Sequence, residues 1–210
     1  AEQRASGADP LATVALATEL FDAVVCDVWA ATLGDLSPAQ AATAAKVAIV
    51  AHGGYGRREM APYSDIDLMI LHDAADASAI ATVSARFVQD LFDAGLQVGQ
   101  SVRTVSEACR LATGDATILS TLLDCRTIAG PTALADKLST RLRRIVRRSP
   151  RRYAEALIDA RQEEADRFGQ TVSLLEPNVK RSPGGLRDIQ LVRWLAVILH
   201  KAESLDELAA

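Results

Sequence analysis

The first half of the chain alternates between helical and strand-like hydrophobic patterns. Between Leu11 and Thr32 the spacing of the apolar residues favours an amphipathic helix. The run KVAIVA at 46–51 is short, rich in β-branched residues and followed by two glycines after His52, so it predicts a strand buried on both faces. A second strand is expected over DIDLMILHD at 65–73, a helix over 80–94 and a third strand over LQVGQSVRTV at 96–105.

After Ser106 the pattern becomes helical nearly to the end of the chain. Glycine and proline residues divide it into helical segments near 106–113, 115–125, 132–148, 150–168 and 186–201. Strands first and helices later predict an α/β half followed by a helical half. We therefore expect one domain over residues 1–130 and a helical domain over residues 131–210.

Composition and charge narrow the class of protein. The 210 residues are 49% hydrophobic and 24% charged, as in a globular chain that buries a core. The net charge of -4 argues against a surface built to wrap nucleic acid, and no apolar run approaches the roughly 20 residues that span a bilayer. The three isolated cysteines fit a reducing compartment better than a disulfide framework or a zinc site. We therefore expect a cytoplasmic protein with no membrane partner.

In the most informative segment, ten residues separate Gly53-Gly54 from Asp65-Ile66-Asp67. Side chains two residues apart on a strand project from the same face, about 6.6 Å apart at about 3.3 Å per residue. Asp65 and Asp67 are therefore expected to project together, while Ile66 faces the core. Two carboxylates at this spacing can share divalent cations, and hard oxygen ligands favour Mg²⁺ or Mn²⁺ over zinc.

The double glycine supplies what the aspartates lack. Without Cβ atoms, the chain at Gly53-Gly54 can approach phosphate oxygens closely and present backbone N–H groups to them. Arg57 and Arg58 add positive charge in the same loop. Taken alone, Asp-x-Asp is often a solvated strand edge and Gly-Gly a turn. Their combination predicts phosphoryl or nucleotidyl transfer, in which metal ions neutralise the charge that develops during an in-line displacement.

The string GGYGRREMAPYSDIDLMIL resembles the bacterial PII-protein uridylyltransferases (uridylyl-removing enzymes), a branch of the nucleotidyltransferase superfamily of DNA polymerase β. The segments VGQSVRT and LEPNVKRSPGGLRDIQ resemble the same family, so the similarity covers about residues 46–208. The resemblance implies an α/β (α+β) nucleotidyltransferase domain with a small, mostly antiparallel mixed sheet, followed by a helical bundle region.

The resemblance also implies roles for single residues. Asp65 and Asp67 would be the metal-binding catalytic pair, Gly53 and Gly54 would hold the triphosphate, and Ser64 would be a polar residue of the loop. The implied reaction is attack by a tyrosine hydroxyl of a PII nitrogen-signalling protein on the α-phosphate of UTP, with Mg²⁺ as cofactor, or Mn²⁺ in its place. ATP is a competing co-substrate, because nothing in the glycine segment reads a base.

Two features depart from the family's pattern. Many members of the superfamily carry a third carboxylate on a later strand, where this chain has Gln97 and Gly99. Arg58 stands where the related family usually has a third glycine. These departures keep two alternatives open: a catalytically weak, nucleotide-binding regulatory module, and adenylyl transfer from ATP to a protein, an RNA or a small molecule.

The turn-rich stretch EPNVKRSPGGLRD has a functional and a structural interpretation. Lys180, Arg181 and Arg187 could contact nucleotide phosphates, because the turn leads into a helix N-terminus. Alternatively, Glu176 and Asp188 pair with these cations, and the turn simply starts a helix. The apolar residues of that helix would then pack inward, namely Leu186, Ile189, Val192, Leu195 and Leu199. Trp194 is expected in the core.

Arginines concentrate between Arg141 and Arg152. Such a stretch could bind RNA or an acidic partner surface. We favour a solvated helix face, partly paired with Glu155 and Asp159, because Tyr153 alone does not provide the aromatic platform of single-strand binders.

Overall fold

The structure is a computed structural model of the chain, and it describes residues 9–60, 64–73, 76–168, 178–200 and 207. The chain divides into two compact units, one drawn from residues 1–110 and 124–139 and the other from residues 111–123 and 140–210. Each unit therefore takes two stretches of sequence. The division expected at residue 130 stays a prediction of domain organisation.

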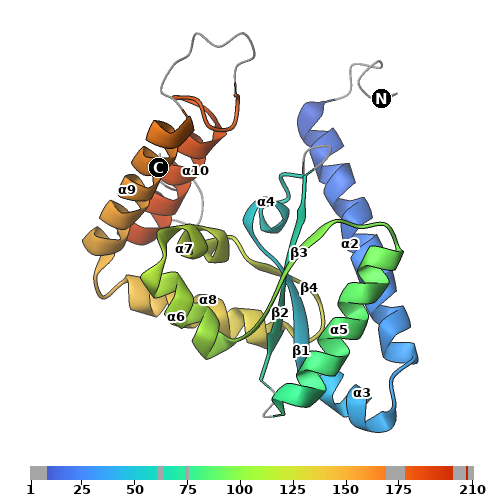
Figure 1. The fold of residues 1–210 in the computed structure, drawn as a ribbon. Helices are drawn as coiled ribbons and strands as arrows, with labels where there is room; N and C mark the ends of the chain where they lie inside the picture. The colour runs from blue at the N-terminus through green and yellow to red at the C-terminus, as the bar shows by residue number, and fades with distance from the viewer. Residues whose placement is uncertain (1–8, 61–63, 74–75, 169–177, 201–206, 208–210) are drawn as a thin grey trace. The chain divides into compact units, whose positions relative to one another are not determined.

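The first unit contains a sheet with flanking helices (Figure 1). Its elements are α2 (Pro10–Gly34), α3 (Pro38–Ala44), β1 (Val47–Ala51), α4 (Gly53–Gly56), β2 (Ile66–His72), α5 (Ala77–Asp93), β3 (Val98–Thr104) and β4 (Arg126–Ala129). The second unit contains α7 (Ala116–Leu123), α9 (Pro150–Phe168), α10 (Leu186–Leu195) and the π-helix η1 (Ala196–His200). The helices α6 (Val105–Gly114) and α8 (Thr132–Val146) run from the first unit into the second.

The four strands form one mixed sheet in the order β3-β2-β1-β4. β1 pairs antiparallel with both β2 and β4, whereas β2 and β3 run parallel. Two of the three strand pairs are therefore antiparallel. The expected α/β (α+β) class with a mostly antiparallel mixed sheet is confirmed.

The core of the first unit lies between the sheet and the helices α2 and α5. All five residues of β1 are fully buried, which confirms the strand predicted from KVAIVA. Trp29 of α2 and Phe87 of α5 meet edge to face, with ring centroids 5.0 Å apart. Burial of such large apolar groups provides most of the favourable free energy of folding and fixes the sheet against its helices.

The helices begin where side chains satisfy their first backbone N–H groups. Ser37 accepts a hydrogen bond from the backbone N–H of Gln40, and the Gln40 side chain accepts one from the Ser37 backbone, which is the capping box that starts α3. Asp76 accepts from the backbone N–H groups of Ser78 and Ala79 at the start of α5. In the described part of the chain no helix combines the length and the apolar character that a membrane span requires.

The sequence predicts no strand after Ser106, but β4 forms between the helical segments expected near 115–125 and 132–148. This four-residue strand joins the free edge of β1, with Ala51 opposite Arg126. The Arg126 guanidinium also binds Asp22 of α2 through two contacts of 2.8 Å. A half-buried strand of this length has no hydrophobic period of its own, and its conformation follows from the edge that it pairs with.

The prediction of which residues of α10 and η1 face inward is also wrong for the most part. Leu186, Ile189, Val192 and Leu199 are between 42% and 51% exposed. The buried row is instead Gln190, Trp194 and Ile198, spaced by four residues, and α10 and η1 contact α9. The helix is apolar on more than one face, so its sequence did not indicate which face its neighbour covers. The expectation that Trp194 lies in the core is confirmed.

Candidate active site

The antiparallel pairing of β1 and β2 brings the two sequence motifs to one end of the sheet. Ala51, the last residue of β1, lies opposite Leu68 of β2. The residues that follow Ala51 therefore stand beside those that precede Leu68. The backbone N–H of His52 continues the pairing by donating to the Asp67 carbonyl oxygen at 3.2 Å. Gly53-Gly54 and Asp65-x-Asp67 thus meet at the same edge.

Gly53 and Gly54 lie in the single turn of α4 that follows β1. Gly53 has a φ of 58°, in the left-handed region that side chains other than glycine rarely adopt. A Cβ added at Gly54 would lie 3.9 Å from its nearest neighbour, an ordinary van der Waals distance, so no atom crowds the main chain there. Gly53 is buried and Gly54 is half-buried, so only Gly54 is partly accessible, and the phosphate contact of the turn stays a prediction.

Two contacts of α4 hold this turn in place. A Cβ at Gly56 would collide with the backbone carbonyl oxygen of Asp124, so only glycine fits this position. Tyr55 is fully buried, and the Arg126 guanidinium lies 5.2 Å from its ring centroid. Burial raises the pKa of Tyr55 well above its ordinary value, which keeps the phenol neutral. Sequence reasoning missed both contacts, because their partners are distant along the chain.

Arg57 holds α4 to the segment before β4. Its side chain is 8% exposed and makes ion pairs of 2.7 Å with Glu59 and 2.8 Å with Asp124. Burial alone would lower the pKa of Arg57, but the two carboxylates raise it overall. The contact with phosphate predicted for Arg57 stays a prediction. Arg58 has a φ of 62°, in the left-handed region that glycine adopts most readily.

Asp67 is the second residue of β2 and is half-buried, whereas Asp65 is exposed one residue before the strand. Ile66 and Leu68, which flank Asp67, are buried in the core as expected. In the parallel register Asp67 lies opposite Gly99 of β3. A Cβ at Gly99 would stand 2.9 Å from Asp67 Oδ1. The Asp67 carboxylate therefore occupies the space over Gly99, one of the two positions where a third acid was sought.

His52 was not predicted to belong to the site. It is half-buried between β1 and α4, and burial lowers the pKa of its imidazole while the nearby Asp67 carboxylate partly opposes that shift. The signal available in the sequence was its position directly before Gly53. Ser64 is half-buried in the segment that leads into β2.

Lys180 and Arg187 belong to the second unit, and their contact with a nucleotide stays a prediction. Lys180 is exposed in a turn, and its own backbone N–H donates to Asn178 Oδ1 at 3.1 Å. Arg187 donates to Gln190 Oε1 at 2.9 Å and lies 3.8 Å from Glu164. Asp188 pairs with Arg161 at 2.6 Å. Glu176, the other expected partner of these cations, lies outside the described residues.

The residues at the edge of the sheet fit a divalent metal ion that carries a phosphate ligand. In the described part of the chain, no group of three or more His, Cys, Asp or Glu residues gathers as a complete metal site. Mg²⁺ is usually held by one or two carboxylates together with substrate phosphates and water. Asp65 and Asp67 provide two such carboxylates beside the half-buried Gly54.

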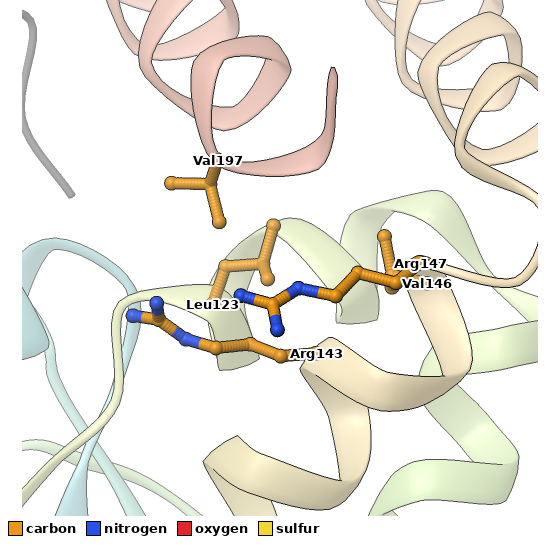
Figure 2. A pocket seen from close by; sticks show the side chains of 5 residues that line it. All are labelled: Leu123, Arg143, Val146, Arg147 and Val197. Carbon is orange, nitrogen blue, oxygen red and sulfur yellow. The ribbon is translucent and has the colours of Figure 1, made fainter. Parts of the chain in front are cut away.

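The arginine-rich stretch forms no comparable site. Figure 2 shows the side chains of Arg143 and Arg147 extending from the end of α8 toward Leu123. The hollow that they line with Val146 and Val197 has a volume of about 10 Å³, room for about one water molecule. The prediction of a solvated face requires exposed arginines on this stretch. The exposed ones are Arg144, Arg147, Arg148, Arg151 and Arg152.

Two family models match the chain. The family described as "Putative nucleotidyltransferase DUF294" matches residues 1–111, and the family described as "GlnD PII-uridylyltransferase" matches residues 152–210. The first match covers the sheet edge described above up to α6. The second covers most of α9 and all of α10.

Curated proteins similar to this chain are named bifunctional uridylyltransferase/uridylyl-removing enzymes. The protein of Pseudomonas aeruginosa (strain LESB58) is 44% identical over 156 residues, which are 72% of this chain and 17% of the relative. The proteins of Azotobacter vinelandii (strain DJ / ATCC BAA-1303) and Burkholderia orbicola (strain AU 1054) are each 44% identical over 154 residues, which are 72% of this chain. The matched part is 17% of the Azotobacter protein and 18% of the Burkholderia protein. The chain thus spans less than a fifth of these relatives' length. The resemblance seen in the sequence is confirmed.

Proposed function

We propose that this chain transfers a uridylyl group from UTP to a tyrosine of a PII-type signalling protein. The chain belongs to the nucleotidyltransferase family whose model matches residues 1–111. One observation supports the proposal: the register of β1 and β2 sets the turn of Gly53-Gly54 beside Asp65 and Asp67. The names of the curated relatives support the choice of uridylyl transfer.

Each residue of the edge has a part in the proposed reaction. Asp65 and Asp67 would hold Mg²⁺, or Mn²⁺ in its place, and the bound metal supplies charge that offsets the developing negative charge on the phosphates. Gly53 and Gly54 would let phosphate oxygens approach the main chain, with Ser64 as a polar neighbour. Lys180 and Arg187 would contact the nucleotide from the second unit. The acceptor oxygen forms a bond to the α-phosphorus, the acceptor loses its proton, and pyrophosphate leaves.

The setting of the reaction is also a proposal. We place it in the cytoplasm, which is supported by the three cysteines, Cys26, Cys109 and Cys125, all of which are free thiols. We further assign the catalytic residues to a domain over residues 1–130, and a supporting role to the helical residues 131–210.

The test measures transfer of label from α-labelled UTP to a PII protein in the presence of Mg²⁺. The native chain should label a tyrosine, and Asp65→Asn and Asp67→Asn should each lower the rate about 100-fold or more, because each removes a charge that acts on the transition state. Asp73→Asn is the matched control, since Asp73 is exposed at the opposite end of β2. Transfer at the native rate by both site variants would exclude the proposal.

A second candidate is a nucleotide-binding regulatory module with little or no transfer. It is favoured by Gly99, because the space above this residue is taken by Asp67 and leaves no room there for a third carboxylate. Pyrophosphate release measured with UTP and with ATP separates the candidates. Release with ATP alone would indicate adenylyl transfer. Nucleotide binding without release from either nucleotide would support the module.

A further inference from the structure

The second unit contains a cavity of about 380 Å³ that the proposed reaction does not explain. It lies among α7, α9, α10 and the turn that precedes α10, and Figure 1 shows these helices of the second unit packed close to one another. Pockets for small molecules commonly have volumes of about 300–1,000 Å³. Leu157, Ala160 and Trp194 form its apolar wall.

Positive charge exceeds negative charge in the lining of this cavity. The lining includes Arg161, Arg167, Arg181 and Arg187, but only two carboxylates, those of Glu163 and Glu164. Asp188, which pairs with Arg161 at 2.6 Å, offsets one further charge. The residues that line the cavity therefore carry a net positive charge.

Three of the guanidinium groups face one carboxylate. Arg181 Nε and Arg187 Nε lie 3.3 and 3.8 Å from the same oxygen of Glu164, and Arg161 Nη1 lies 3.9 Å from the other. Charge-assisted hydrogen bonds are usually about 2.7–2.9 Å long. Glu164 is therefore not close enough to any of the three for a strong bond of this kind.

Arg161 is the most enclosed of these cations. Its side chain is 11% exposed, and its Nη1 is buried and donates no hydrogen bond to the described part of the chain. A buried cationic donor without an acceptor costs free energy, which an anion in the cavity would recover.

The wall formed by α7 has the opposite character. Ser120 Oγ donates to the Thr117 carbonyl oxygen at 2.7 Å, and Thr121 Oγ1 donates to the Ile118 carbonyl oxygen at 2.9 Å. Because these protons are used within the helix, the hydroxyl oxygens of the wall are left as acceptors. A ligand that fits both walls combines an anion with several oxygens and hydrogen-bond donors elsewhere.

We propose that this cavity binds a phosphate-bearing small molecule through Arg161, Arg181 and Arg187. A phosphate group has oxygens enough to accept from several planar guanidinium groups at once. A nucleoside phosphate would add the N–H groups of a base, and inorganic pyrophosphate would supply the anion alone. The inference rests on the proposed function at one point, because the proposed function also assigns Arg187 to contact with the nucleotide.

The test is calorimetric titration of the full chain with sodium pyrophosphate and with UMP. Divalent metal is omitted, so that Asp65 and Asp67 do not contribute. Arg181→Gln should weaken binding about tenfold, the effect expected on loss of one charge-assisted hydrogen bond. Arg151→Gln is the matched control, because Arg151 is exposed on α9, does not line the cavity and changes the net charge equally.

A third variant separates ligand binding from a purely structural role. Glu164→Gln removes the carboxylate that competes for the three arginines, so it should tighten the binding of pyrophosphate. An ion-pair network with no ligand would show no such gain. Tighter binding of UMP than of pyrophosphate would identify a nucleoside phosphate as the ligand, and the reverse order would identify the inorganic anion.

Three results would overturn the inference: no heat with either ligand, equal affinity in the Arg181→Gln and Arg151→Gln variants, or weaker binding by Glu164→Gln. Failure of the proposed function is distinguishable from these results. Asp67→Asn should lower the rate of transfer about 100-fold or more and keep native affinity for pyrophosphate. If the native chain transfers no label but binds pyrophosphate in an Arg181-dependent way, the proposed function fails and the cavity assignment stands.

Discussion

At the scale of single residues, Asp67 and Gly99 depend on each other. The carboxylate of Asp67 lies over a position that carries no side chain, and that space sets where its oxygens point. Gly99 is therefore a positioning residue for the proposed metal site. Its place opposite Asp67 follows from the strand register, which a single sequence does not contain.

Gly99→Ala should lower the transfer rate about tenfold or more, because a small displacement of a catalytic group is costly. The added Cβ would stand 2.9 Å from Asp67 Oδ1 and push the carboxylate aside. Steady-state kinetics and Mn²⁺ affinity measure the effect, and urea unfolding checks that the fold is intact. Gly34→Ala is the control, since its Cβ meets nothing within 4 Å. Native rate and metal affinity in Gly99→Ala would contradict this role.

The motif residues could be predicted from the sequence, but their partners could not. Gly53-Gly54 and Asp65-x-Asp67 were found from residue type and spacing alone. The sequence predicts Arg57 to be a cation near phosphate, and the structure adds its ion pair with Asp124, 67 residues further along the chain. Such long-range contacts depend on the packing of the whole unit.

At the scale of elements, long periodic segments were predictable and short or ambiguous ones were not. β1, β2 and β3 follow from apolar runs and alternation, and α2 and α5 from helical spacing. β4 was missed because four half-buried residues carry no period, and its pairing with β1 decides its conformation. The buried face of α10 was misassigned because apolar residues occupy more than one of its faces.

Asp188 links the start of α10 to α9, and its effect on stability should depend on pH. It accepts from Arg161 Nε and from the Gly184 backbone N–H, each at 2.6 Å. Burial alone would raise its pKa, but these two donors hold the pKa of Asp188 below its ordinary value. The folded pKa then lies below the unfolded one, about 3.9. The carboxylate therefore stabilises the fold above that pH and loses this effect as the pH falls through the folded pKa.

Asp188→Asn should lower the urea midpoint of unfolding at pH 7, and the difference from the native chain should narrow as the pH is lowered toward about 3. Chemical unfolding followed by circular dichroism over this pH range measures the difference. A difference that stays constant from neutral to acidic pH would show that Asp188 does not act through its charge.

At the scale of the whole molecule, the proposed chemistry is concentrated in a small part of the fold. The chain spans less than a fifth of the length of its curated relatives, yet it contains both the sheet edge and the helices that the two family models match. The two compact units each combine two stretches of sequence, because α6 and α8 both run from one unit into the other.

The central claim is that Asp65 and Asp67 hold a metal–triphosphate complex beside the Gly53-Gly54 turn. Electron paramagnetic resonance of Mn²⁺, titrated into the chain with a non-hydrolysable UTP analogue, tests this claim most directly. The native chain should bind Mn²⁺ more tightly than the analogue does alone, and Asp67→Asn should lose that gain while Asp73→Asn keeps it. Equal Mn²⁺ binding by the native chain and the Asp67→Asn variant would contradict the claim.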